Sequence, residues 1–172
     1  MTHRQTLSKT ERLKSYKRIR ILFAQGQKFK VFPLVVYFLM RGEEIGSASK
    51  KMAAEGVNDV EGAEGLSEVS RVQGDSEMVL NAEGVLQMGV SVGKRHFKRA
   101  VDRNLLKRRI REAYRKQKHE LKEILASSGI SMDIFFVYSN ARISEYAEIE
   151  SAMQQGLILL QEKIKTQNSK NE

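Results

Sequence analysis

Residues 94–116 read KRHFKRAVDRNLLKRRIREAYRK, a stretch in which eleven lysine and arginine side chains accompany only two acids, Asp102 and Glu112. On a helix that advances about 100° per residue, this stretch separates into an apolar side and a basic side. It therefore predicts a helix from about Ala100 to about Leu125, with one face in a core and the other toward a polyanion. The apolar side collects Leu106, Ile110, Ala113, Tyr114 and Leu121, and the basic side collects Asn104, Lys107, Arg108, Arg111, Arg115 and Lys118.

The charge of this stretch has a simpler explanation, a solvated helix surface, but such surfaces usually interleave both signs. Here acids are nearly absent, and a field of one sign repels itself unless an anionic partner neutralises it. Arginine outnumbers lysine by seven to four. Because guanidinium groups grip phosphates bidentately and stack on bases, the bias favours a structured nucleic acid over a membrane surface.

Length and composition limit the class of protein. The 172 residues, 41% of them apolar, are enough for a single domain with a hydrophobic core. We therefore expect residues 1–172 to form one RNA-binding domain. There is no cysteine, and His3, His96 and His119 are too scattered to suggest a zinc site. We find no signal-peptide core and no apolar run approaching the roughly 18 residues of a membrane span, so we expect a cytoplasmic protein without a membrane partner.

A glycine-rich acidic segment interrupts the chain at residues 42–84, with ten acids, three bases and no aromatic residue. Its composition predicts a disordered loop, because it cannot bury enough apolar surface to order itself. Removing its net charge of −7 from the total of +9 leaves +16 on the rest of the chain. A sharper alternative is that its acids shield the basic surface until RNA displaces them. We also expect a frayed tail at 166–172.

The segments around the basic helix read as alternating helices and strands. Ser15 can cap a helix that runs to Gln25 and ends at Gly26. Pro33 suits the start of a strand over 34–40, and residues 85–92 read as a second extended stretch broken at Gly89 by a bend or bulge.

After the basic helix, residues 127–129 (SSG) end helical structure, and 132–138 (MDIFFVY) supply another apolar strand. Ser144 can cap a last helix whose apolar residues recur at spacings of three and four. The expected order is α-β-(insert)-β-β-α-β-α. We therefore predict an α+β fold, a small two-layer sandwich of helices against a mainly antiparallel sheet.

The sequence offers little for catalysis by the protein itself. A nuclease would need clustered carboxylates for metal ions or a histidine general base, and the basic region contains only Asp102 and Glu112. Asp102 suits the helix dipole and Glu112 can pair with Lys116, so both have structural explanations. Phosphate-cradling loops and the KH and RRM signatures are also missing. We predict no catalytic residue and no metal held by the protein alone; it binds, and something else cuts.

Three motifs in order resemble the bacterial ribonuclease P protein component: GVSVGKR at 89–95, RAVDRN at 99–104 and KRRIRE at 107–112. The similarity also covers residues 13–26, the strand with Tyr37, the strand at 133–138 and the last helix, which is essentially everything outside the insert. Such an ordered set is far more specific than a cluster of charge.

This resemblance implies a fold with a left-handed βαβ crossover, similar to the second domain of a small-subunit ribosomal protein, although the usual crossover is right-handed. It also implies an accessory subunit of an endoribonuclease. In that family, the catalytic RNA removes the 5′ leader of precursor tRNA with Mg²⁺ bound mainly by the RNA. The implied partners are the ribonuclease P RNA and precursor tRNA, with no protein partner required.

Site residues follow from the resemblance position by position. A cleft between sheet and first helix would hold the single-stranded leader, lined by Phe23 and Tyr37, with Ile19 where the family usually has an aromatic ring. Without the resemblance, both rings would more simply be core. The catalytic-RNA-binding set would be Lys94, Arg95, Arg103, Asn104, Lys107, Arg108, Arg111 and Arg115.

Leu105 is a second departure, because the family's RNR motif has an arginine there; Arg103 or Arg109 could cover the lost charge. Two alternatives also remain: a non-enzymatic ribosome-associated or structural RNA-binding module, and a DNA-binding protein. Preference for folded RNA over duplex DNA would separate the second. The oligomeric state and any substrate beyond precursor tRNA are not predicted.

Overall fold

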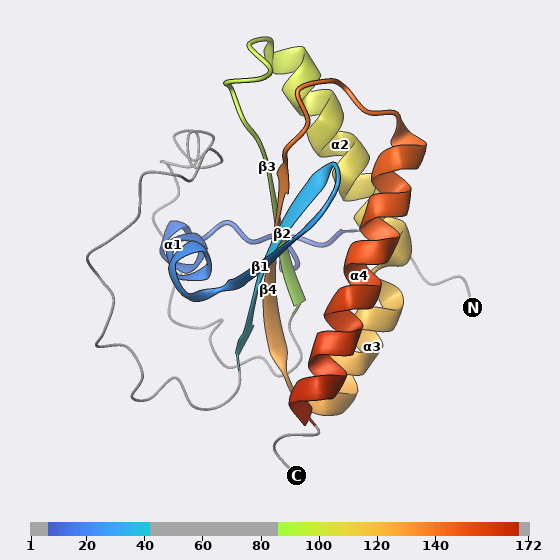
Figure 1. Ribbon diagram of the computed structural model, residues 1–172. Helices are drawn as coiled ribbons and strands as arrows, with labels where there is room; N and C mark the ends of the chain where they lie inside the picture. Colours follow the sequence, from blue (N-terminus) through green and yellow to red (C-terminus); the bar gives the residue numbers. More distant parts are fainter. Residues whose placement is uncertain (1–6, 42–85, 169–172) are drawn as a thin grey trace.

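A computed structural model describes residues 7–41 and 86–168, which form one sheet and the helices around it (Figure 1). The α+β class predicted from the sequence is confirmed. The insert at 42–84 and the last four residues lie outside the described residues. The elements are α1 (Tyr16–Gln25), β1 (Gln27–Val31), β2 (Leu34–Arg41), β3 (Leu86–Val92), α2 (Ala100–Gln117), α3 (His119–Ser128), β4 (Ser131–Tyr138) and α4 (Tyr146–Asn168).

The four strands lie in the order β1-β2-β4-β3. β1 with β2 and β2 with β4 are antiparallel, whereas β3 and β4 are parallel, so the sheet is mainly antiparallel as expected. The parallel pair is joined through α2 and α3. The left-handed sense of this connection stays a prediction from the resemblance.

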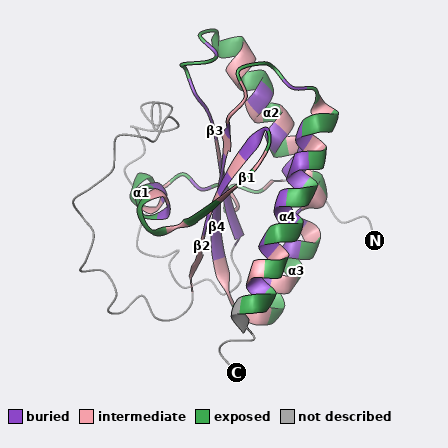
Figure 2. Cartoon of the chain, viewed as in Figure 1, coloured by how far each residue is buried: buried purple, intermediate pink, exposed green. Residues whose placement is uncertain are grey.

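Helices cover both faces of the sheet. α2, α3 and α4 pack on one face, and α1 packs on the other (Figure 1). Figure 2 shows buried residues along the sheet and on the helix sides turned toward it. The two-layer sandwich that we expected describes the larger core, and α1 adds a smaller third layer because Ile19 and Leu22 bury their side chains on the opposite face.

One strand was not predicted. β1, QKFKV, forms a hairpin with β2 through the cis Phe32–Pro33 peptide. Its local pattern is weak, because charged residues alternate with Phe29 and Val31 in a short edge strand that has only one apolar side. Pro33 therefore lies in the turn just before β2, close to the predicted strand start.

The expected break at Gly89 is wrong. β3 continues through this residue, and a Cβ built at Gly89 would lie 2.3 Å from the ring of Phe135. The glycine makes room for that ring instead of bending the strand. The observed order is therefore α-β-β, the undescribed segment, then β-α-α-β-α.

The two long helices also differ in detail from the prediction. The basic helix is divided at Lys118 into α2 and α3, and α3 ends at Gly129, whose φ of 64° is left-handed. α4 begins two residues after Ser144, whose hydroxyl accepts a hydrogen bond from Asn140 Nδ2 at 3.3 Å. α4 continues to Asn168, so it includes the first three residues of the expected frayed tail, and the fraying itself stays a prediction.

Candidate nucleic-acid interface

α2 presents the first candidate surface. Its Leu106, Ile110, Ala113 and Tyr114 side chains are buried in the core. The opposite side carries Asn104, Arg108 and Arg111, all exposed, together with the half-buried Lys107. Asp102 in the first turn and Arg115 and Lys116 in the last turn complement the helix dipole. The two faces predicted from the sequence are therefore present on this helix.

Several of the basic side chains also bind the protein itself. Arg103 donates from Nη1 to the carbonyls of Phe97 and Lys98, both at 2.8 Å, and Arg109 donates to the Ser144 carbonyl at 2.5 Å. The Arg103 bonds hold the turn before α2 in place, and the Arg109 bond ties α2 to the loop between β4 and α4. Both arginines, which could replace the charge missing at Leu105, thus also have a structural role. Leu105 itself is exposed, with 39% of its surface accessible.

Arg115 forms a bidentate pair with Glu112, with Nε to Oε2 at 2.9 Å and Nη2 to Oε1 at 2.5 Å. This hydrogen bond lowers the pKa of Glu112 and raises the pKa of Arg115. An exposed pair of this kind is weak, so a phosphate can compete for the guanidinium. Arg115 therefore stays in the candidate set with a partner to displace.

Lys118 does not belong to the basic surface. Its side chain is 4% accessible, and its Nζ lies 2.5 Å from Oε2 of Glu11, while Lys122 approaches the other carboxylate oxygen at 3.4 Å. Burial alone would raise the pKa of Glu11, but the hydrogen bonds from Lys118 and the Ser8 amide and the two lysine charges bring it below its ordinary value. The expected exposure of Lys118 is therefore wrong.

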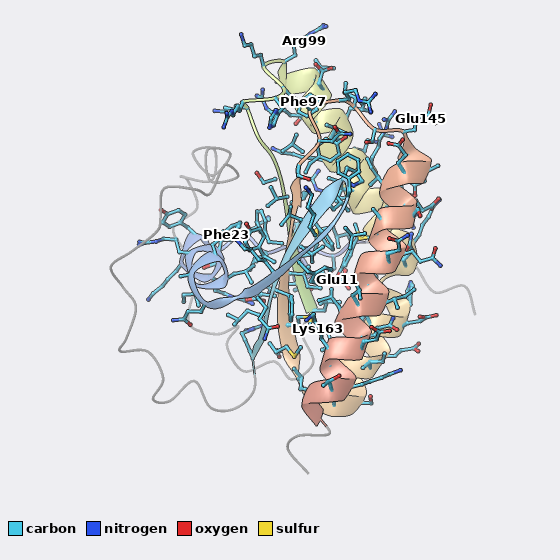
Figure 3. The ribbon with its side chains drawn as sticks, in the orientation of Figure 1. Glu11, Phe23, Phe97, Arg99, Glu145 and Lys163 are labelled. Carbon is cyan, nitrogen blue, oxygen red and sulfur yellow. The ribbon has the colours of Figure 1, made fainter. Side chains whose placement is uncertain are left out.

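Lys94 and Arg95 occupy the exposed turn between β3 and α2. Phe97 anchors this turn, because its side chain is buried and its ring centroid lies 5.8 Å from that of Tyr138. Figure 3 shows Phe97 and Arg99 together at the beginning of α2. The anchored turn therefore leads directly into α2 with the Lys94–Arg95 pair exposed, and the binding role of the pair stays a prediction.

Arg12 is a basic residue that the sequence analysis missed. The segment that contains it pairs with the free edge of β3: the Leu13 amide donates to the Met88 carbonyl at 2.9 Å, and the Met88 amide donates to the Glu11 carbonyl at 2.8 Å. Partial burial, and then the charge of Arg12, lower the pKa of Arg111. Two neighbouring guanidinium groups favour an anion between them, but no local pattern relates positions 12 and 111.

The second candidate surface lies between α1 and the sheet. Phe23 meets Tyr37 and Phe135 edge to face, with centroid distances of 4.6 Å and 5.1 Å. Phe135 is buried, whereas Phe23 and Tyr37 are partly exposed. Figure 3 shows Phe23 on the sheet side of α1. Both rings thus pack against the small core while part of their surface stays exposed. A core role and a stacking role are therefore compatible for Phe23 and Tyr37.

Ile19 is a correction. Only 2% of its surface is accessible, because it packs with Leu13, Leu22 and Phe135 beneath α1. A side chain this buried has no surface to offer a base. The residue therefore belongs to the small core and cannot line the leader cleft that the resemblance implies.

α1 is held over the sheet by an ion cluster. Asp133 on β4 is 2% accessible and accepts hydrogen bonds from Nε and Nη2 of Arg18, the first at 3.1 Å, while Arg41 Nη2 lies 3.4 Å from the same carboxylate. Burial and then the charge of Arg18 lower the pKa of Arg41, and Asp133 opposes them. The cluster fixes the helix that carries Phe23.

Within residues 7–41 and 86–168, no three His, Asp or Glu side chains lie together in a way that could hold a metal ion. No helix there is long and apolar enough to cross a membrane.

Known proteins resemble this chain over most of its length. A family model described as Ribonuclease P matches residues 7–161. The ribonuclease P protein components of two Porphyromonas gingivalis strains are 30% and 31% identical over 166 residues, covering 96% of this chain and 94% of theirs. The component of Erwinia tasmaniensis is 46% identical over 55 residues, or 30% of this chain and 46% of its own.

The fold also matches a solved structure. The Staphylococcus aureus RNase P protein superposes with a TM-score of 0.53 at 18% sequence identity, covering 88% of this chain and 96% of that one. At this identity, the match supports the arrangement of helices and strands.

Proposed function

Because this chain belongs to the ribonuclease P protein family and is a protein subunit of ribonuclease P, we propose that it is an accessory subunit for an RNA catalyst. In this proposal, the RNA cuts precursor tRNA at the 5′ end of the mature sequence, using Mg²⁺ held mainly by the RNA. The protein binds both the catalytic RNA and the single-stranded leader. No catalytic residue is assigned to the protein.

The observation that carries the proposal is the exposed side of α2. Asn104, Lys107, Arg108 and Arg111 share this side, and Lys94 and Arg95 are exposed in the turn that precedes α2. Backbone phosphates of a folded RNA are the ligands that such a surface suits. We include Arg12 in this interface because it is exposed on the segment that pairs with β3 at Met88.

The aromatic surface supports the second half of the proposal. Base stacking on an exposed ring is worth about 1–3 kcal/mol and tolerates any base, which suits leaders of differing sequence. Phe23 and Tyr37 offer such ring surface, and Phe135 supports them from the sheet.

The deciding experiment is cleavage of a precursor tRNA by a bacterial ribonuclease P RNA at limiting Mg²⁺, with the RNA alone, the protein alone and both together. We expect the protein to restore cleavage only when the RNA is present. Tight binding to structured RNA without stimulation would point to a structural RNA-binding module, and cleavage by the protein alone would overturn the proposal.

A variant pair tests the α2 surface within the same assay. Lys107→Ala with Arg108→Ala should weaken binding to the catalytic RNA and flatten the salt dependence by about one to two units of slope. Lys163→Ala with Lys165→Ala removes the same charge from α4, on the other face of the sheet from α1 (Figure 1). An unchanged salt slope in the α2 variant would remove this helix from the interface.

A further inference from the structure

Cross-strand rows organise the sheet face that carries α1. Lys28 on the edge strand β1 lies opposite Tyr37 on β2, and Tyr37 lies opposite Phe135 on β4. Because directly paired residues point to the same face, Lys28 stands beside the aromatic group. Its distance from the tyrosine is one strand spacing, about 4.8 Å between backbones.

The next row repeats this arrangement. Lys30 lies opposite Val35, which lies opposite Val137 on β4. α1 instead sits over the other side of the Tyr37 row, where its Arg18 binds Asp133. The two valines are therefore only half-buried, and the Lys30 row remains partly open.

The two lysines are available to an anion. Both side chains are exposed, whereas Phe29 and Val31 between and after them turn toward the main core. Among the residues that the structure describes, no acid forms an ion pair with either lysine. Lys30 Nζ lies 5.9 Å from the centroid of Phe32, a ring that is 60% exposed at the hairpin turn.

Lysines on an edge strand have a structural explanation, since charge discourages pairing between the edges of two molecules. That explanation also accounts for the face, because Phe29 and Val31 take the side of β1 that packs against the main core. It does not account for the aromatic rings that flank the two lysines. Here both cations lie on the face of Tyr37, and the row ends beside an exposed aromatic ring. Cations next to stacking rings are the arrangement that binds single-stranded nucleic acid.

We propose that Lys28 and Lys30 form a phosphate-binding row that extends the aromatic surface to the β1 edge of the sheet. The ligand is the backbone of the single-stranded RNA that stacks on Phe23 and Tyr37, so the inference rests on the proposed function. β3 lies at the opposite edge of the sheet from β1, and α2 packs against β3. The lysine row therefore binds the part of the leader farthest from the catalytic RNA.

The test compares precursor tRNAs whose leaders increase in length one nucleotide at a time. Lys28→Thr with Lys30→Thr removes both charges and keeps residues that favour a strand. Lys28→Arg with Lys30→Arg keeps the charge, and Lys163→Ala with Lys165→Ala removes equal charge from α4, whose residue Lys163 Figure 3 labels. Each variant is assembled with the catalytic RNA, and its affinity is measured against leader length and salt.

We expect the threonine variant to stop gaining affinity at a shorter leader than the unaltered protein. Its salt slope on long leaders should fall by about 1.4, which corresponds to two single-strand phosphate contacts. The arginine variant and the α4 variant should both retain the original length dependence. Binding to mature tRNA should be unchanged in every variant.

Three outcomes would contradict the proposal that Lys28 and Lys30 bind leader phosphates. An unchanged length dependence in the threonine variant excludes it, while the proposed function stands if Tyr37→Ala still loses leader binding. An equal loss for mature tRNA would show that the lysines attract RNA only through general charge. If the unaltered complex does not distinguish leader-bearing from mature tRNA, the proposed leader site and the row fail together.

Discussion

The ring of Phe135 fills the space that a side chain at Gly89 would need. A Cβ at this position would lie 2.3 Å from Cδ2 and 2.4 Å from Cε2 of Phe135, which is itself buried. We expect Gly89→Ala to lower the free energy of unfolding by about 1–3 kcal/mol, as overpacking does. Denaturant unfolding measures the loss, and an unchanged midpoint would mean that the ring is not confined.

Gly156 supplies the matched control within the same chain. A Cβ there would lie 3.7 Å from Cγ2 of Val36, which is ordinary contact, and the residue is inside α4. Gly156→Ala should therefore raise the free energy of unfolding by up to about 1 kcal/mol, because alanine favours a helix more than glycine does. The two substitutions add the same methyl group, but they should change the free energy of unfolding in opposite directions.

Tyr37 is the residue on which the two explanations of the aromatic group can be separated. Tyr37→Ala should weaken binding of leader-bearing precursor by about 5- to 150-fold, the equivalent of one stacked base, with little change for mature tRNA. Tyr37→Phe keeps the ring and should bind like the unaltered protein. Titration of both RNAs with the assembled complex measures the difference, and equal losses for both would assign the ring to the core alone.

At the level of elements, the Glu11–Lys118 pair ties the amino-terminal segment to the junction of α2 and α3. The two residues are 107 positions apart and almost fully buried together. Glu11→Gln should lower the free energy of unfolding at neutral pH by about 2 kcal/mol, because a charged hydrogen bond is lost beside a buried cation. Glu112→Gln, which alters an exposed pair, should change it little.

The difference in free energy of unfolding between the unaltered protein and Glu11→Gln should depend on pH in a definite direction. The pKa of Glu11 in the folded protein lies below the ordinary value of 4.5, so its stabilising effect is complete above that pH. It should fade as the pH falls through the lowered pKa. Unfolding measured from about pH 7 to about pH 3 should show the two proteins converging at the acid end, and a constant gap would exclude the carboxylate as the cause.

Elements with a strong local pattern were predictable. α2 shows both its apolar and its basic face, α1 begins after the Ser15 cap, and the apolar run of β4 reads directly as a strand. β1 was missed because its lysines, which now carry the further inference, break an apolar pattern in a strand of only five residues. Local periodicity cannot report a short strand whose stability comes from pairing with β2.

Across the whole molecule, the features that the sequence could not show are contacts between distant positions. Partial burial and the charge of Arg12 lower the pKa of Arg111, and Glu11 removes Lys118 from the basic surface to which helical spacing had assigned it. Ile19 likewise fits a cleft by resemblance but is buried by its neighbours. The pattern thus identifies the helix with a basic face, whereas the set of side chains exposed on that face depends on tertiary pairing.

Arg41 and Leu86, the described residues on either side of segment 42–85, lie close enough for a short linker to join them. Arg41 at the end of β2 pairs with Ser131, and Leu86 at the start of β3 pairs with Met132, so one strand separates them. The gap is about 10 Å, which a linker of roughly eight residues can span. Replacing residues 42–85 by such a glycine–serine linker should preserve the fold.

The same replacement tests how charge is distributed over the whole protein. Residues 42–84 carry a net −7, so the shortened chain rises from +9 to +16. It should bind RNA several-fold more tightly at low salt, with the advantage shrinking as salt screens it. A full-length variant with the ten acids of this segment changed to their amides should behave the same way if charge, and not length, is the cause. Weaker binding by the shortened chain would instead mean that the segment contributes to the interface.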